Sequence, residues 1–427
     1  MKSLYDAVHQ PIHSIKIGIF TALLTLSTPA FVRAASDDPP ANPQPISLSI
    51  PSVSAIPDYD YAVTNGLYAT ITGCNGLKCK DFKDERIKLS SPLCKKEIEA
   101  RVLWQNKPAP LVVILPGISM SAKDPEPRLW ASTLFAAGNN VLMLDSPFRV
   151  SFNEATQSGV TCNMESEARV CGTLILSFLK TQKAHDNVTR VGLFGASYGG
   201  VIALNLNRLT VTEHDKLPLT LDRVLVFSPP VNLKSTVALL DRYQLDREHD
   251  GFSIDLFQEM AGHKAVARGV VLPFTDPQMR GAVGYYFHEL LTPTVISNNR
   301  QYKLEILEQE AGKVNEVLSD TDLDPVAAHW TYTRYINEMV LPYWQKQGSI
   351  SRVEDLWNMG STETQLTYGA GRVHVVVTED DPLNNAEDVQ SLKRRFGSST
   401  LTVLPHGGHL GYIGCAWAKD RLSKIFQ

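Results

Sequence analysis

The chain has 427 residues, of which 43% are hydrophobic, 20% charged and 8% aromatic. This is the composition of an ordinary globular protein, and it excludes a collagen-like, low-complexity or largely disordered chain. Lysine and arginine total 41 against 45 aspartates and glutamates, so the formal net charge is −4. The densest basic run, residues 393–395, is typical of a solvated helix face. We therefore exclude a nucleic-acid binder, which would carry an extended basic patch.

The N-terminal segment has the pattern of an export signal. Lys2 and Lys16 precede an apolar run over residues 17–32, which is short for a helix that must cross about 30 Å of hydrocarbon. Small residues then lead to Ala34, after which we expect cleavage. Residues 1–34 are therefore predicted to be a signal peptide of a periplasmic or extracellular protein. An uncleaved membrane anchor is the alternative, and membrane association is expected only through this segment.

Cysteine usage agrees with export. The six cysteines are at positions 74, 79, 94, 162, 171 and 415. An even number in an exported chain favours disulfides, whose connectivity the sequence leaves open. If all six pair, at least one bridge must join the first three to the last three. A metal site is the alternative, but the spacing lacks a Cys-x-x-Cys pair.

The elements expected in chain order indicate an α/β protein. Residues 35–60 are rich in proline and are predicted to be a linker, and residues 61–103 have a short β-like pattern with turns at Gly66, Gly73 and Gly76. Buried strands are expected over 111–115, 141–144, 190–194, 223–227, 372–377 and 401–404, with helices over 128–137, 165–179 and 201–209. Apolar runs without alternation are typical of strands covered on both faces, so we predict a mostly parallel sheet with helices on both faces.

One long interval interrupts this alternation. Residues 229–371 show mainly helical patterns, and they are too many for a loop in a compact domain. We predict a helical cap inserted between two parts of one α/β core, residues 61–228 and 372–427. Aromatic residues and one methionine recur in the cap at helical spacing, and they form either its own core or the lining of an apolar channel. They are Trp330, Tyr332, Tyr335, Met339, Tyr343 and Trp344.

The strongest chemical signal is Ser197, in the run Gly-Ala-Ser-Tyr-Gly-Gly between an expected strand and an expected helix. A nucleophilic serine on a sharp strand-to-helix turn needs small neighbours, which Gly195 and Gly199 provide. Serine alone is a weak nucleophile and requires a base within hydrogen-bond reach. The histidine loop after the last strand supplies His409 as the preferred base, with His406 as the alternative.

A third group should orient that histidine and stabilise its cation. The strand over 372–377 is followed by Glu379, Asp380 and Asp381, at the same edge of the predicted sheet as Ser197. We prefer Asp381, because the Asp-Pro-Leu step is the usual turn after such an acid, and we keep Asp380 and then Glu379 as alternatives. An acyl-transfer site also needs donors for the developing oxyanion. We assign the backbone N–H groups of Tyr198 and Ile118.

These motifs together resemble the α/β-hydrolase superfamily, in particular its esterase and lipase branch with a His-Gly-Gly-His-Leu-Gly-Phe-type loop. The matching motifs are the Gly-x-Ser-x-Gly turn, the Pro-Gly loop after the strand over 111–115, Asp-Asp-Pro-Leu and His-Gly-Gly-His-Leu-Gly-Tyr. The resemblance covers residues 101–427 and implies a serine hydrolase acting on carboxylic esters, often of lipids, without metal or cofactor. Ser197, Asp381 and His409 match the triad positions, and Ile118 and Tyr198 match the oxyanion positions. The chain departs from the family where His-Gly is common before the oxyanion donor, because it has Leu-Pro-Gly-Ile-Ser.

Two other functions fit the same residues. A peptidase or amidase could use the same triad, and the Ser-Tyr-Gly-Gly turn also resembles that of prolyl-oligopeptidase-type enzymes. Residues 35–100 are too few for the propeller domain of those enzymes. A catalytically silent binding protein with this fold is the third hypothesis.

Overall fold

The computed structural model describes residues 46–47, 56, 58–73, 82–249, 253, 255–256, 271–272, 274–313, 316 and 318–427. The predicted signal peptide, residues 1–34, lies outside the described residues, as do Cys74 and Cys79. Most of the predicted linker, residues 35–60, lies outside them as well.

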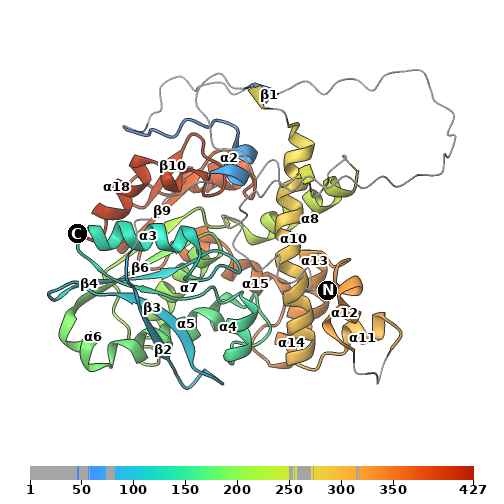
Figure 1. Ribbon diagram of the computed structural model, residues 1–427, viewed down its shortest axis with the longest axis horizontal. Coiled ribbons are helices and arrows are strands. Elements are labelled where there is room, and N and C mark those ends of the chain that lie inside the picture. The colour runs from blue at the N-terminus through green and yellow to red at the C-terminus, as the bar shows by residue number, and fades with distance from the viewer. Residues whose placement is uncertain are drawn as a thin grey trace, which may run out of the picture.

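The centre of the molecule is a mostly parallel sheet, as predicted, and it has eight strands (Figure 1). Its strands stand in the order β2-β3-β5-β4-β6-β7-β9-β10. Strand β3 runs antiparallel to both of its neighbours, and all other pairs are parallel. In chain order the strands are β2 Glu85–Leu89, β3 Ile98–Leu103, β4 Ala109–Leu115, β5 Asn140–Met143, β6 Val188–Ala196, β7 Arg223–Phe227, β9 Val373–Thr378 and β10 Leu401–Leu404.

Helices cover both faces of this sheet, which explains the unbroken apolar runs. In β4, Val112 and Ile114 pack into one cluster with α3 and α18, whereas Leu111, Val113 and Leu115 pack into the cluster on the opposite face with α5, α7 and α17. Successive side chains of a strand point to opposite faces, so both sets must be apolar. These helices are α3 Pro125–Ala136, α5 Met164–Leu179, α7 Tyr198–Thr212, α17 Ala386–Arg395 and α18 Ala416–Lys424, and the shorter α4 Val150–Ala155 and α6 Gln182–Asn187 lie among them.

The interval between β7 and β9 is mainly helical and lies beside the sheet (Figure 1). The one strand in its described part is β8, Val271–Leu272. Its helices are α8 Leu233–His249, α10 Asp276–Gln301, α11 Ile306–Glu310, α12 Asp320–Ala327, α13 Tyr332–Tyr335, the π-helix η2 Ile336–Val340, α14 Leu341–Lys346, α15 Val353–Met359 and α16 Thr362–Gln365. No helix in the described ranges is long and apolar enough to cross a membrane.

The aromatic stripe of this insertion is buried. Trp330 and Tyr335 have no exposed surface, and the Tyr332 hydroxyl donates to the Phe287 carbonyl at 2.8 Å. The Trp344 indole N–H donates to the Val160 carbonyl of the core at 2.9 Å. The stripe therefore forms the core of the insertion and its contact with the sheet domain. The boundaries of the predicted domains stay a prediction.

The β-like interpretation of residues 61–103 is wrong at its start, where the chain forms helix α2, Gly66–Thr72. The Asn65 side chain accepts from Tyr68 N–H and caps this helix. The burial of Tyr68 in the tertiary structure outweighs the weak preference of the local sequence for a β conformation. Gly66 is the first residue of this helix instead of a turn, whereas Gly73 lies in the turn at its end, and Gly76 lies outside the described residues. Both described glycines also mark close approaches to other segments. A Cβ at position 66 would lie 1.9 Å from the Asp380 carbonyl oxygen, and one at position 73 would lie 2.2 Å from Gly411 Cα.

The predicted linker also begins to pack before residue 60. Residues Ile46–Ser47 form strand β1, which pairs antiparallel with β8. The Tyr59 hydroxyl donates to the His406 carbonyl at 2.5 Å, and the Asp60 carboxylate accepts from two backbone N–H groups at the start of α18. Contacts across more than 340 residues of chain hold this segment, so local composition cannot reveal them.

The cysteine prediction fails for the described cysteines, because Cys94, Cys162, Cys171 and Cys415 are all free thiols. Cys162 and Cys171 are buried in the main core, where a thiol packs as a small apolar side chain. Burial raises the pKa of both thiols well above the ordinary value. In the described part of the chain, Cys162 and Cys171 therefore serve packing and not pairing.

Candidate active site

The turn between β6 and α7 holds Ser197 in a strained conformation, with φ 53° and ψ −124°. Its N–H donates to the Phe227 carbonyl of the neighbouring strand at 2.9 Å. The glycines on either side of Ser197 are required because a side chain at either position would clash with the backbone. A Cβ at Gly195 would lie 2.6 Å from the Gly199 carbonyl oxygen, and one at Gly199 would lie 2.1 Å from the Leu115 carbonyl oxygen. The sequence thus folds into a tight strand-to-helix turn that presents the serine at the carboxyl edge of the sheet.

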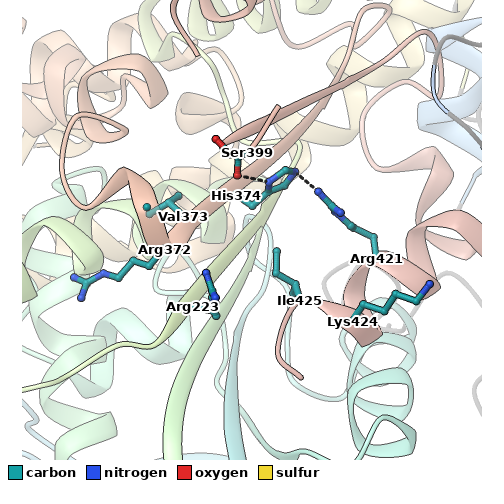
Figure 2. Close-up of a pocket in the computed structure, with 9 residues that line it drawn as sticks. Arg223, Arg372, Val373, His374, Ser399, Arg421, Lys424 and Ile425 are labelled. Atoms are coloured by element: carbon teal, nitrogen blue, oxygen red, sulfur yellow. Dashed lines mark hydrogen bonds between the residues drawn. The ribbon is translucent and has the colours of Figure 1, made fainter. Parts of the chain in front are cut away.

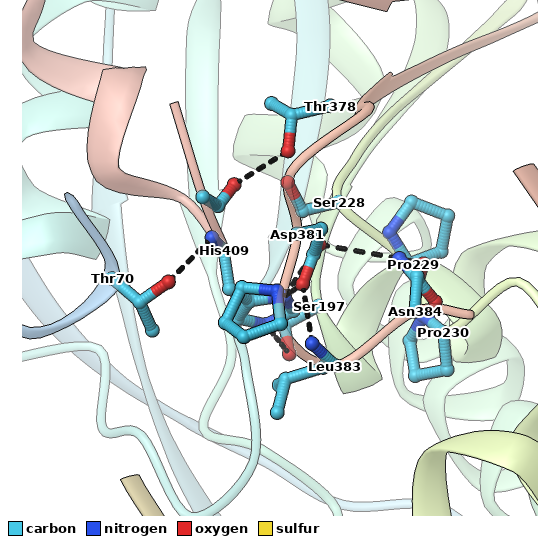
Figure 3. A network of polar contacts seen from close by, with 12 residues as sticks. Thr70, Ser197, Ser228, Pro229, Pro230, Thr378, Asp381, Leu383, Asn384 and His409 are labelled. Carbon is cyan, nitrogen blue, oxygen red and sulfur yellow. Dashed lines mark hydrogen bonds and ion pairs between the residues drawn. The ribbon is translucent and has the colours of Figure 1, made fainter. Parts of the chain in front are cut away.

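The structure brings Ser197, His409 and Asp381 together in one chain of hydrogen bonds (Figure 3). His409 Nε2 lies 2.8 Å from Ser197 Oγ, and His409 Nδ1 lies 3.0 Å from one Asp381 oxygen and 3.2 Å from the other. An ionised carboxylate only accepts hydrogen bonds, so Nδ1 carries the proton and Nε2 is free to accept from the serine. All three side chains are buried, and Ser197 and His409 retain only 7% exposure each.

The acidic loop after β9 gives its three carboxylates different surroundings. Asp381 also accepts from Leu383 N–H at 2.9 Å and from the Asn384 amide at 3.2 Å, which fixes its oxygens toward His409. Asp380 instead accepts from the backbone N–H groups of residues 407 and 408. Burial is the main reason that the pKa of Asp380 is raised to about 6. Glu379 forms an ion pair with Lys393 at 2.6 Å. Only Asp381 of these three contacts the histidine.

The alternative base, His406, faces away from the serine. Its Nε2 donates to the Tyr61 carbonyl at 2.6 Å, and its ring lies edge-on to Tyr59 with centroids 5.1 Å apart. His406 therefore fastens the N-terminal segment to the histidine loop.

Thr70 of α2 is a site residue that the sequence did not indicate. Its Oγ1 accepts from the His409 N–H at 2.8 Å and donates to the Gly66 carbonyl at 2.7 Å (Figure 3). On the other side of the loop, the Thr378 hydroxyl donates to the Gly408 carbonyl at 2.9 Å. Thr70 and His409 are 339 residues apart in the chain, and no local pattern marks such a pair.

The loop after β4 lies against the serine turn, as expected for an oxyanion loop. A Cβ at Gly117 would lie 3.4 Å from Ser197 Cβ, and Ile118 is the next residue, partly buried against the core. Asp145 accepts from Ala122 N–H at 2.7 Å, and Arg149 donates to the Ser119 carbonyl at 3.1 Å. The segment that follows β5 therefore holds this loop in place. Tyr198 follows the serine directly as the first residue of α7. The donor roles of Ile118 and Tyr198 stay predictions.

A hollow of about 230 Å³ at the opposite edge of the sheet is separate from the triad (Figure 2). It lies at the amino ends of β7 and β9, where Arg223, Arg372 and Arg421 line it. The Arg372 guanidinium is already bound to neutral oxygens of residues 207, 210 and 221, and Arg421 donates to His374. Arg372 and Arg421 therefore serve the packing of this edge.

The described residues contain no group of three or more His, Cys, Asp or Glu side chains placed to hold a metal ion.

No protein-family model matches the chain, and no curated protein matches it. Among solved structures, an esterase from Pyrococcus furiosus is 13% identical with a TM-score of 0.41, over 81% of this chain and 90% of that one. A carboxyl esterase from the mycorrhizal fungus Tuber melanosporum is 14% identical with a TM-score of 0.41, over 81% and 86%. The fold of this chain follows from its own topology. Its strand order with one antiparallel strand, and its serine on the turn between β6 and α7, are those of the α/β-hydrolase fold.

Proposed function

We propose that the protein is a serine hydrolase that cleaves carboxylic esters through an acyl-enzyme. The observation that carries the proposal is the hydrogen-bonded chain from Ser197 through His409 to Asp381, built from the carboxyl ends of three strands of one sheet. Substrates of open α/β sheets bind at this edge. The choice of esters comes from the motifs after β4, β6, β9 and β10, which resemble those of esterases.

In the first half of the reaction, Ser197 Oγ attacks the ester carbonyl while His409 Nε2 takes the hydroxyl proton. The new C–O bond makes the carbonyl oxygen an oxyanion, which the N–H groups of Tyr198 and Ile118 would bind. Asp381 stabilises the imidazolium through Nδ1. Collapse of the intermediate breaks the bond to the alcohol, and His409 returns the proton to that leaving oxygen.

In the second half, water replaces the alcohol. His409 takes a proton from the water, the hydroxide oxygen bonds to the acyl carbon, and Ser197 leaves with the proton back on Oγ. The products are an alcohol and a carboxylic acid. Because Ser197 is only 7% exposed, the ester must enter between groups that now cover the serine, and the helices between β7 and β9 are our candidates for the acyl-binding part.

Fluorophosphonate labelling tests this proposal. The reagent should add once to the purified protein, peptide mapping should place the adduct on Ser197, and Ser197→Ala should remove both the label and nearly all ester turnover. An unlabelled, folded wild-type protein would contradict the proposal. Matched ester and anilide substrates with one acyl group then separate an esterase from an amidase, and we expect the ester to be cleaved much faster.

We also infer that the protein is exported, on the pattern of residues 1–34 alone. The intact mass of the protein recovered from its native host should correspond to a chain that begins at Ala35. A mass that includes residues 1–34 would contradict cleavage at this position.

A further inference from the structure

A buried carboxyl group lies beside the serine turn and has no part in the triad. Glu167 of α5 has no exposed surface, and no ion pair to it occurs among the described residues. The Tyr198 hydroxyl donates to its Oε2 at 2.6 Å, and Cys162 N–H donates to its Oε1 at 2.9 Å. Burying an acid without a cation is costly, and burial raises the pKa of Glu167 to about 7 even though both hydrogen bonds lower it.

The partner of this acid is the residue next to the nucleophile. Tyr198 carries a backbone N–H that we assign to the oxyanion hole, and its ring is buried edge-on against Phe148, with centroids 5.5 Å apart. The hydroxyl is the polar group of this side chain, and its hydrogen bond to Glu167 fixes the position of the ring. Because Ser197 has a strained backbone, the orientation of the following peptide depends on what holds Tyr198.

The same loop that contacts Glu167 also reaches the insertion. Cys162 has φ 82°, an unusual conformation for a non-glycine residue, and this bend accompanies the hydrogen bond from its N–H to Glu167. The preceding residue, Thr161, is hydrogen-bonded to the Tyr335 hydroxyl at 2.5 Å, and the Asn298 amide donates to both. A continuous buried polar network thus runs from α10 and α13 to the serine turn.

We propose that Glu167 is a positioning residue of the oxyanion hole, which through the Tyr198 hydroxyl holds the Tyr198 N–H toward the reacting carbonyl, and that its carboxylate form does this best. The inference depends on the proposed function, because it assigns Tyr198 N–H to the oxyanion. A carboxylate accepts both donors that surround it. When Glu167 is protonated, one of its two oxygens carries a proton where it would otherwise accept a hydrogen bond. This weakens the hydrogen bond that orients Tyr198.

The other titratable groups that face Glu167 do not compete with it near neutral pH. They are Cys162 of the preceding loop, Cys171 on its own helix, Tyr198 of α7 and Tyr335 of α13. Burial raises the pKa of each of these thiols and phenols well above the ordinary value. A change in this cluster between about pH 6 and pH 8 is therefore a change of Glu167.

A double-mutant cycle on ester turnover tests the coupling. We expect Tyr198→Phe and Glu167→Gln each to lower kcat about 10-fold with KM nearly unchanged, because misplacing an oxyanion donor costs less than removing it. The double variant should be no slower than either single one. Thr210→Val is the matched control, since it removes another buried hydroxyl of α7 that donates to a carbonyl, and it should stay within about twofold of wild type. Wild-type kcat in Tyr198→Phe, or losses that multiply in the double variant, would overturn the inference.

The pH profile of kcat gives a readout that a merely structural role would not move. The wild-type profile should contain an increase centred near pH 7 that Glu167→Gln lacks. Superimposable profiles would overturn the inference. If Glu167→Gln does not fold, Tyr198→Phe alone decides, because it leaves the carboxyl group in place.

Fluorophosphonate labelling separates this failure from that of the proposed function. If the wild-type protein does not label at Ser197, the proposed function fails and the inference fails with it. If wild type and Tyr198→Phe label and turn over ester equally fast, only the positioning role of Glu167 is wrong.

Discussion

At the scale of single residues, adjacent carboxylates in the chain have different roles because their side chains contact different groups. Asp380 is partly buried and the adjacent Asp381 is buried, and one binds two backbone N–H groups of the histidine loop whereas the other binds His409. Glu379 beside them pairs with Lys393 at the surface. The role of each carboxylate is set by direction and surroundings, and not by residue type.

This difference predicts the effects of removing each charge. Asp381→Asn should lower kcat by about 10⁴-fold, because an amide no longer selects the Nδ1–H form of His409. Glu379→Gln, the control, should change kcat less than about twofold, because a partly exposed ion pair contributes little. Steady-state ester hydrolysis measures both. An Asp381→Asn enzyme with wild-type kcat would show that another group orients the histidine.

At the scale of elements, helix α2 acts as a support for the histidine loop. Gly66 and Thr70 contact that loop from one side, while Tyr68 and Ala69 pack with Met279 of α10 on the other. The N-terminal segment therefore joins the carboxyl-terminal part of the core to the insertion, and the position of His409 depends on α2, which precedes the motif-bearing residues 101–427.

Thr70→Val should damage both stability and activity. The change leaves the His409 N–H without its acceptor, which costs about 1–3 kcal/mol in unfolding free energy, and it frees the histidine loop to shift, so kcat should fall. Thr72→Val is the control, because Thr72 lies in the same helix, is buried and bonds only the Tyr68 carbonyl. Urea unfolding and ester turnover measure the two effects. Equal losses in the two variants would refute a specific role for Thr70.

Gly66→Ala tests the close approach of the two segments. Alanine favours a helix over glycine, so helix propensity alone would stabilise the protein, but a Cβ 1.9 Å from the Asp380 carbonyl forces the segments apart. We expect unfolding free energy to fall by about 1–3 kcal/mol. Gly397→Ala is the control, because its added Cβ would have no atom within 4 Å, and it should leave the unfolding free energy nearly unchanged. A stabilised Gly66→Ala protein in urea unfolding would mean that α2 does not pack as described.

At the scale of the whole molecule, buried titratable groups make stability depend on pH in opposite directions. Burial lowers the pKa of His374 from 6.5 to about 4, so unfolding takes up a proton in this range and the contribution of His374 to stability is lost as pH falls from about 6.5 to 4. Burial raises the pKa of Asp380 from 3.8 to about 6, so the folded state holds this proton more tightly and stability is lost as pH rises over that range.

Urea unfolding at several pH values should separate the two groups. His374→Gln should remove a slope of up to about 1.4 kcal/mol per pH unit with which stability falls on acidification from pH 6.5 to 4. Asp380→Asn should remove a slope of similar size and opposite sign. If both variants keep the wild-type pH dependence, these groups are not buried as the structure has them.

The sequence by itself determined the strand-and-helix core, and it predicted the three residues of the candidate triad with Asp380, Glu379 and His406 as alternatives. Unbroken apolar runs such as β7, predicted and found at residues 223–227, are dictated by burial on both faces, and the glycines around Ser197 are dictated by space in the turn. Parallel strands deliver their following loops to one edge, so the order Ser197, Asp381, His409 along the chain was enough to expect that these residues meet.

Only the tertiary structure decided what lies beside these residues. Helix α2 replaced an expected β segment because Tyr68 and Ala69 find partners in α10, two of the four described free cysteines are buried in the core, and Asp380 proved to hold the histidine loop. Thr70 and Glu167 carry no local signal, since the contact of Thr70 with His409 joins positions 339 residues apart and that of Glu167 with Tyr198 joins two separate helices. Local sequence encodes periodicity and turn geometry, whereas such contacts depend on how the whole chain packs.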